Sequence, residues 1–262
     1  MAVNRPPLAD RVAIVTGGSV GIGFTAALAL VRAGVRVALV SRDQERVQHA
    51  AAELAQSANE AKKDHILALA LDVRSPEDME AMASRTLARF GRIDMLITAA
   101  GILRVGRGVL RTLAQTPEEE WDEIIRTNLK GTFLANRAVL PAMLRQGYGQ
   151  IVNLSSTSGR KGLAFDAAYC ASKFGVIGLT EALAAEVEHY GIKAHVLLPG
   201  AIDTGMWEQN GPLAPPPDII GPERVADCIL QLLTLPEDTV LDAVVVEPLK
   251  RHVFPARAEG RA

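Results

Sequence analysis

The amino-acid sequence predicts an α/β protein built on a doubly wound parallel sheet of about seven strands flanked by helices. Short apolar, β-branched runs alternate with longer helical patterns from residue 11 onward. Most of these runs are continuously apolar, which is typical of strands covered on both faces. Several helical stretches end in Gly, a residue that often follows a helix. Repeated strand–helix–strand units of this kind form parallel sheets.

The elements follow in order along the chain. We expect strands at 12–16, 35–40, 66–71, 93–98, 150–155, 193–198 and 240–247. Helical patterns lie between them at 24–34, 44–58, 76–91, 119–140 and 171–191. Before the fourth helical pattern, Thr116 is expected to cap the helix, with Pro117 at its first position and Glu119 at its third.

No long linker, repeat or change in composition divides the 262 residues, so the sequence predicts one domain over 1–262 with a core at about 9–247. Two segments differ from the rest. Residues 202–222, which we call the lid, combine Pro and Gly with apolar side chains such as Trp207, and we expect them to cover a substrate. The tail at 250–262 is typical of a loosely held terminus.

Composition and charge exclude several classes of function. A formal net charge of −2 gives no electrostatic reason to expect nucleic acid or an acidic membrane as a partner. Two cysteines, and five histidines without metal-ligand spacing, argue against a disulfide framework and a metal site. No apolar run reaches the roughly 18 residues of a membrane span, and no secretory leader is evident. We therefore expect a cytoplasmic protein.

The stretch TGGSVGIG at 16–23 follows the first expected strand and opens a helix. Such a turn directs backbone N–H groups and the positive end of the helix dipole toward one spot, where a phosphate can bind. Gly17 permits a sharp turn, Gly21 the close approach of a pyrophosphate, and Gly23 close packing of helix on strand. The spacing differs from G-x-G-x-x-G, so a glycine-rich turn without a ligand stays an alternative.

The end of the second strand bears on the choice of cofactor. An Asp or Glu there binds the 2′-hydroxyl of NAD, whereas this chain has Ser41 followed by Arg42. A guanidinium at this place favours the 2′-phosphate of NADP. The carboxylate of Asp43 keeps NAD as an alternative cofactor. The alternative to any cofactor role is that Arg42 is solvated and Asp43 caps the following helix.

Tyr169 and Lys173 are four residues apart in a helical pattern, so both side chains lie on one face. A nearby ammonium can lower the pKa of a tyrosine by about 1 to 3 and so fit it for acid/base catalysis. An exposed helix pair is the simpler interpretation of this motif alone. Ser156 favours chemistry, because it ends a strand thirteen residues earlier, at the edge of the sheet where ligands bind. Asn128 lies inside a helical pattern and is either solvated or an interruption that supports a water.

Taken together, these motifs resemble the short-chain dehydrogenase/reductase family, over about residues 9–247. Thr-Gly-x-x-x-Gly-x-Gly, Asn128, Ser156, Tyr-x-x-x-Lys and Pro199-Gly200 with Thr204 occur in the family's order and approximate spacing. The resemblance implies a Rossmann-type fold in which Tyr169 is the acid/base, Ser156 binds the substrate carbonyl, Lys173 binds the nicotinamide ribose, and Asn128 holds a water. It also implies a homodimer through helices within 117–146 and 167–190, often within a tetramer.

The cofactor site that the resemblance implies would hold NADP(H), with NAD(H) as the second choice. Asp72 would contact adenine, and 199–204 would hold the nicotinamide carboxamide. The full implied set is Gly17, Ser19, Gly21, Ile22, Gly23, Ser41, Arg42, Asp72, Val73, Ala99, Gly101, Tyr169, Lys173, Pro199, Gly200, Ile202 and Thr204.

The chain departs from the family's pattern in two places. Ala99 stands where the family has an Asn that braces the sheet, which puts local stability in doubt. The last strand lacks the glycine-rich end of many members, which argues against the 3-oxoacyl reductase subgroup. Arg104, Arg107 and Arg111 could meet an acidic substrate, although loop arginines are more often solvated.

The sequence therefore predicts an NADP(H)-dependent oxidoreductase that interconverts a carbonyl compound and a secondary alcohol, with a partly apolar small molecule as substrate. One alternative is a nucleotide-binding regulator on the same fold with weak catalysis, which should show a damaged catalytic set. A sugar-nucleotide epimerase or dehydratase is a third hypothesis, which the glycine spacing and the chain length fit poorly.

Overall fold

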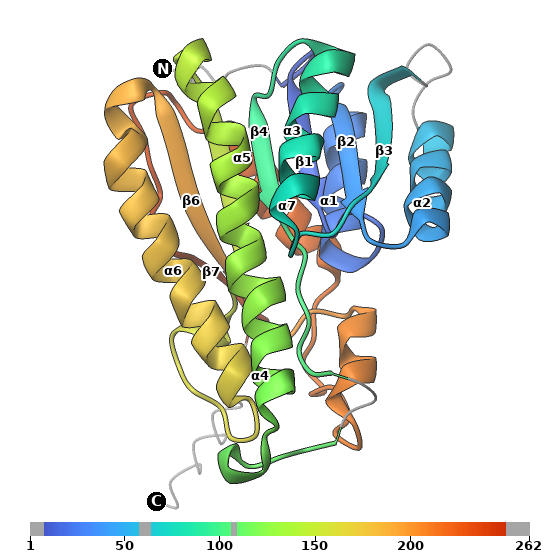
Figure 1. Ribbon diagram of the computed structural model, residues 1–262, viewed down its shortest axis with the longest axis vertical. Helices are drawn as coiled ribbons and strands as arrows, with labels where there is room; N and C mark the ends of the chain where they lie inside the picture. The colour runs from blue at the N-terminus through green and yellow to red at the C-terminus, as the bar shows by residue number, and fades with distance from the viewer. Residues whose placement is uncertain (1–7, 58–63, 106–108, 250–262) are drawn as a thin grey trace, which may run out of the picture.

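A computed structural model describes residues 8–57, 64–105 and 109–249. Seven parallel strands form one sheet in the order β3-β2-β1-β4-β5-β6-β7 (Figure 1). The strands are β1 Val12–Thr16, β2 Arg36–Ser41, β3 Ile66–Ala70, β4 Met95–Thr98, β5 Gly149–Leu154, β6 Ile192–Pro199 and β7 Val244–Val246. The predicted doubly wound sheet is confirmed.

Helices cover both faces of this sheet (Figure 1). One core cluster joins the sheet to the first, second and last of them, and another joins it to the third, fifth and sixth. The helices are α1 Gly21–Arg32, α2 Gln44–Ser57, α3 Pro76–Phe90, α4 Glu118–Ile125, α5 Gly131–Gln146, α6 Ala167–Val187 and α7 Pro222–Leu233. The last helix was not among the predicted patterns, although Pro222 at its first turn is a usual start signal.

The order of the strands reverses beside β1, which pairs with β2 on one side and β4 on the other. In open parallel sheets the loops that leave such a point run in opposite directions and open a crevice beyond the carboxyl ends of the strands. The lid, drawn in orange, and α4 lie at this end in Figure 1. The fold thus fixes where a ligand can bind.

Two local predictions were wrong. Thr116 does not cap α4: its hydroxyl donates instead to the carbonyl of Thr112, 3.0 Å away, and Pro117 is the capping residue. The last strand is shorter than the predicted 240–247. Lys193 and His195 of β6 bind the carbonyls of Thr239 and Leu241 at 2.9 Å, so these backbone groups have side-chain partners instead of a neighbouring strand.

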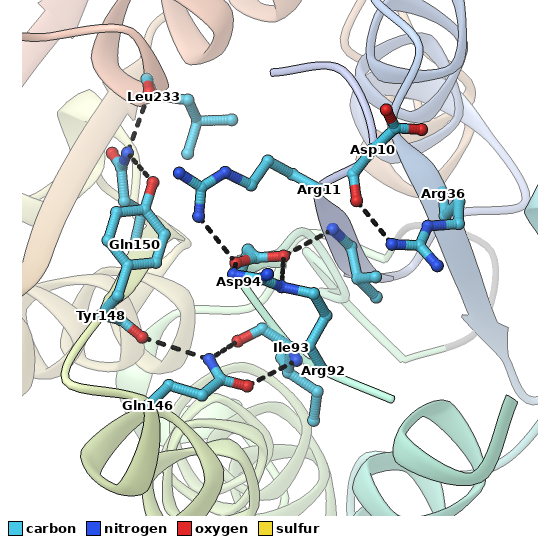
Figure 2. Close-up of polar contacts among 11 residues, drawn as sticks. Asp10, Arg11, Arg36, Arg92, Ile93, Asp94, Gln146, Tyr148, Gln150 and Leu233 are labelled. Carbon is cyan, nitrogen blue, oxygen red and sulfur yellow. Dashed lines mark hydrogen bonds and ion pairs between the residues drawn. The ribbon is translucent and has the colours of Figure 1, made fainter. Parts of the chain in front are cut away.

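A buried carboxylate ties the first and fourth strands together at the opposite end of the sheet (Figure 2). The side chain of Asp94 is fully buried and accepts hydrogen bonds from Arg11 at 3.1 Å, from Arg92 at 2.5 Å and from the backbone N–H of Val12 at 2.9 Å. Arg11 also lies over the ring of Tyr148, 4.3 Å from its centroid. A buried charge with this many partners holds its position firmly.

We expect Asp94→Ala to lower the free energy of unfolding by about 2 to 4 kcal/mol, because two arginines and a backbone N–H lose their acceptor. Denaturant unfolding followed by circular dichroism measures this change. The matched control is Asp227→Ala, which removes the exposed Arg224–Asp227 pair at 3.9 Å and should cost less than about 0.5 kcal/mol. Equal effects of the two substitutions would contradict this role for Asp94.

Candidate active site

The turn between β1 and α1 is shaped by glycines that no other residue could replace. Gly17 has φ +66°, and a Cβ there would lie 2.6 Å from the backbone nitrogen of Ala100. A Cβ on Gly23 would lie 2.3 Å from the carbonyl oxygen of Gly17. Val20, which caps α1, has no side-chain acceptor for the first N–H groups of the helix. These donors fit a pyrophosphate, so the turn is consistent with a dinucleotide site.

This turn borders an open cavity of about 1430 Å³ beyond the carboxyl ends of the strands. Most residues of the predicted site line it. Those from the predicted set are Gly17, Gly21, Ile22, Gly23, Ala99, Gly101, Ser156, Tyr169, Lys173, Pro199, Gly200, Ile202 and Thr204. Ser19, Ser41, Arg42, Asp72, Val73 and Asn128 do not line it.

Three of the predicted catalytic side chains converge on the cavity from two elements. Tyr169 and Lys173 lie one turn apart on α6, and both are buried rather than exposed. Lys173 Nζ lies 5.7 Å from the centroid of the Tyr169 ring and donates to the carbonyl of Leu154 at 2.9 Å. Ser156 follows β5, and its Oγ accepts from the N–H of Ser158 at 3.1 Å. The alternative of an exposed helix pair is wrong.

Burial dominates the titration of these groups. It raises the pKa of Tyr169 to about 12, which a hydrogen bond from Ser156 only partly opposes, while the charge of Asp166 raises it further. Burial also lowers the pKa of Lys173 to about 8. The expectation that Lys173 lowers the pKa of Tyr169 is not met, because removal from water disfavours the phenolate more than its neighbours favour it. Tyr169 is therefore a protonated phenol at neutral pH.

Asn128 is fully buried at the point where the α4–α5 helix is interrupted. Residues 126–130 form a π-helical turn, as the interruption hypothesis requires. The side-chain oxygen of Asn128 accepts a hydrogen bond from the N–H of Ile102 at 2.8 Å. The side-chain nitrogen of Asn128 donates to the carbonyl of Ile102 at 2.9 Å and to Ser172 Oγ at 3.0 Å. Asn128 thereby links the loop after β4 to α6, and a solvated position is excluded.

Near the end of β2, where the adenosine of the cofactor is expected, two of the predicted residues contact each other. Ser19 donates to Ser41, with 2.9 Å between the two hydroxyl oxygens. Arg42 is half-exposed and lies 3.8 Å from a carboxylate oxygen of Glu123 on α4. Arg46 lines the cavity and was not predicted.

The neighbouring Asp72 is held by Arg74, whose Nε and Nη2 donate to its carboxylate at 2.9 and 2.5 Å. Hydrogen bonds from Arg74 and the charges of Arg74 and Arg42 outweigh burial, so the pKa of Asp72 is lowered. Val73 packs against Gly131, where a Cβ would lie 2.8 Å from the valine side chain.

Hydrogen bonds next to Ala99 stabilise the sheet where the sequence left its stability in doubt. Thr98 Oγ1 donates to Asn153 Oδ1 at 2.8 Å, and Asn153 donates to Thr180 Oγ1 at 3.1 Å. This buried series of hydrogen bonds joins β4, β5 and α6 one residue before Ala99. An amide on β5 therefore braces the strands where the family's usual Asn is missing.

Arg104 was named as a candidate contact for an acidic substrate, but its burial and its partners were not predicted. Arg104 is buried, contrary to the expectation of a solvated loop residue, and contacts Asp166 and Asn210. Arg111 instead pairs with Glu120 at 2.6 Å, and Arg107 lies outside the described residues. The only sequence signal for Arg104 was its apolar neighbours Ile102 and Leu103, which is a weak one.

Within the described ranges, no helix is long and apolar enough to cross a membrane. No cluster of His, Cys, Asp or Glu in this part of the chain could hold a metal ion. A cytoplasmic location stays a prediction.

Comparisons with known proteins show the family to which the chain belongs. The family model described as short chain dehydrogenase matches residues 11–213. An uncharacterized oxidoreductase of Staphylococcus haemolyticus is 33% identical over 247 residues, covering 92% of this chain and 99% of the relative. Levodione reductase of Leifsonia aquatica is 35% identical over 201 residues, covering 77% of this chain and 73% of the relative.

A solved structure of a variant actinorhodin polyketide ketoreductase with NADPH is also similar. It has a TM-score of 0.80 and 31% identity, and covers 91% of this chain and 96% of the other. The chain therefore belongs to the short chain dehydrogenase family and is an NAD(P)-dependent oxidoreductase acting on CH–OH and C=O groups.

Proposed function

We propose that the protein is an NADP(H)-dependent reductase of a partly apolar carbonyl compound, with Tyr169 as general acid in reduction and general base in the reverse reaction. The observation that carries this proposal is that Tyr169, Ser156 and Lys173 line the same cavity as the glycine turn. Residues that recognise a dinucleotide and residues that move a proton thus share one space. A regulator that had lost turnover would have no need of this arrangement.

NADP(H), when bound, supplies or accepts the hydride. The chain's own residues handle the proton: Tyr169 Oη donates it to the carbonyl oxygen as that oxygen gains negative charge. Ser156 Oγ donates a hydrogen bond to the same oxygen and holds it in place. Because burial raises the pKa of Tyr169 to about 12, the phenol carries the proton that reduction requires. Lys173, whose pKa burial lowers to about 8, is fixed by Leu154 beside the tyrosine ring.

Arg42 supports NADP(H) over NAD(H). Ser41 and Arg42 stand where an NAD enzyme has an acidic residue, and the similar ketoreductase structure contains NADPH. Arg42 faces Glu123, and a 2′-phosphate would compete with that carboxylate for the guanidinium. The Arg42–Glu123 pair is half-exposed and loose, so the phosphate can replace it at little cost.

The substrate side of the cavity supports an apolar or partly apolar carbonyl compound. Leu163, Met206, Trp207, Leu213 and Pro216 form its wall. One relative is named for the reduction of levodione and one similar structure is a polyketide ketoreductase. These names support a ketone as the class of substrate.

Self-association through α5 and α6 completes the proposal. The two helices lie side by side on one face of the sheet (Figure 1). Phe133, Leu144 and Phe174 on these helices are 40 to 47% exposed. Large exposed apolar side chains on neighbouring helices are typical of a homodimer interface.

We expect Tyr169→Phe to lower kcat for carbonyl reduction by at least about 100-fold, since the general acid is lost. NADPH binding, followed by its fluorescence, should change little. Tyr190→Phe is the matched control, because Tyr190 is exposed at the far end of α6. Near-normal turnover in Tyr169→Phe would show that the proton comes from another group.

We expect Arg42→Ala to lower kcat/KM for NADPH by about 10- to 100-fold, the loss of one charge-assisted contact, and to leave NADH nearly unchanged. Steady-state rates with both nucleotides measure the effect. Arg126→Ala removes an equal charge at an exposed pair with Asp122 and should not alter the ratio. An unchanged NADPH/NADH ratio in Arg42→Ala would remove the 2′-phosphate role.

We expect Phe133→Glu combined with Phe174→Glu to convert the dimer to a monomer, because buried carboxylates at the interface are costly to desolvate. Light scattering coupled to size exclusion measures the mass. Val240→Glu, at an equally exposed apolar position on another segment, should keep the dimer. A monomeric wild-type protein would sink the proposed interface.

A further inference from the structure

Arg104 is the most unusual charged residue near the cavity. Arginines are mostly exposed, yet this one is 5% exposed. Its Nη1 donates to the side-chain oxygen of Asn210 and its Nη2 to the carboxylate of Asp166. One guanidinium therefore joins the loop after β4, the lid and the segment that starts α6.

The lid side of this junction has a second contact. The side-chain oxygen of Gln209 accepts from the backbone N–H of Leu103 at 2.9 Å and from that of Arg104 at 3.4 Å. Asn210, the next residue, is buried. Gln209 and Asn210 end a short helical segment of the lid, Gly205–Asn210. Trp207 of the same segment donates its indole N–H to the carbonyl of Ile202 at 2.8 Å. The end of the lid segment over the substrate side thus depends on Leu103 and Arg104.

The other side of the junction is close to the proposed acid. Asp166 caps α6 three residues before Tyr169, and its charge raises the pKa of Tyr169. Ser156, Cys170 and Lys173 also face Tyr169. The paired Arg111 and Glu120 line a small pocket together with Tyr169 and Asp166. Arg104 acts on Asp166 directly through their ion pair. Burial raises the pKa of Asp166, and the charge and hydrogen bond of Arg104 oppose only part of that rise.

We propose that Arg104 is a positioning residue with two roles: it holds the lid closed through Asn210, and it masks the negative charge of Asp166 beside Tyr169. This inference rests on the proposed function of Tyr169. The two roles use different nitrogens of the guanidinium, so different substitutions separate them.

The lid role is tested by Asn210→Leu and Arg104→Met. We expect each to raise KM for the carbonyl compound about 10-fold, as the loss of one buried hydrogen bond implies, with kcat within about threefold of wild type. The probe is the ketone that wild-type protein reduces fastest with NADPH. Arg104→Lys should not restore KM, since one ammonium cannot reproduce the two-sided geometry of the guanidinium.

The charge role is tested by the pH profile of alcohol oxidation. Because the pKa of Tyr169 is about 12, the profile is read on its rising limb below that pKa, where the rate is proportional to the fraction of phenolate. In Arg104→Met the unmasked carboxylate should move this rise to higher pH by roughly half a unit or more, and Asp166→Asn should move it to lower pH. Adding Arg104→Met to Asp166→Asn should produce no further shift. Arg104→Lys should restore the wild-type profile, because a lysine still neutralises Asp166.

A readout without turnover separates this inference from the proposed function. The sequence has two tryptophans, so in a Trp121→Phe background only Trp207 of the lid emits. We expect acrylamide to quench Trp207 at least about twofold more efficiently in Asn210→Leu and Arg104→Met than in the background protein, since an open lid exposes the indole.

Unchanged quenching together with an unchanged KM would overturn the lid role. The charge role would be overturned if Arg104→Met left the pH profile unchanged. It would also be overturned if Arg104→Met shifted the profile equally in the wild-type and in the Asp166→Asn background. Absence of any carbonyl reduction by the wild-type protein would instead contradict the proposed function, and quenching would still decide whether Arg104 holds the lid.

Discussion

The close contact between the glycine turn and the end of β4 is the constraint on which the rest of the structure depends. Gly17 and Gly23 bring the start of α1 against Ala99 and Ala100, where no side chain would fit. The order of the strands reverses at β1. The turn after β1 and the loop after β4 therefore run in opposite directions and leave the cavity between them. The backbone N–H groups at the start of α1, the side chains of Tyr169 and Lys173 on α6, and the lid all border this cavity.

Around that space, two of the buried polar side chains, Asn128 and Lys173, have hydrogen-bond partners within the protein. Asn128 bonds both backbone groups of Ile102 and the hydroxyl of Ser172, while Lys173 bonds Leu154. A buried polar group without a partner is costly, so these contacts permit few alternative arrangements. The position of Lys173 on α6 is therefore fixed by its neighbours, with Tyr169 buried one turn away on the same helix.

The sequence predicted those parts of the fold and site that depend on local pattern. Continuous apolar runs predicted the parallel sheet, and the spacing of Tyr169 and Lys173 predicted their shared helix face. The sequence could not predict contacts between residues that are far apart in the chain. Arg104 contacts Asp166 and Asn210, which are 62 and 106 residues away, and nothing in the loop that contains Arg104 indicates these partners. The pKa of Tyr169 was misjudged for a related reason, because a four-residue motif carries the neighbouring ammonium but not the depth of burial.

The carboxylate of Asp94 has a consequence for how this protein can change. Asp94 pairs with Arg11 and Arg92 at the end of the sheet opposite the cavity (Figure 2), and none of the three lines the cavity that the lid borders. Mutations that alter the lid therefore leave the fastening of β1 to β4 intact. Substitutions in the lid can therefore accumulate without loosening the sheet.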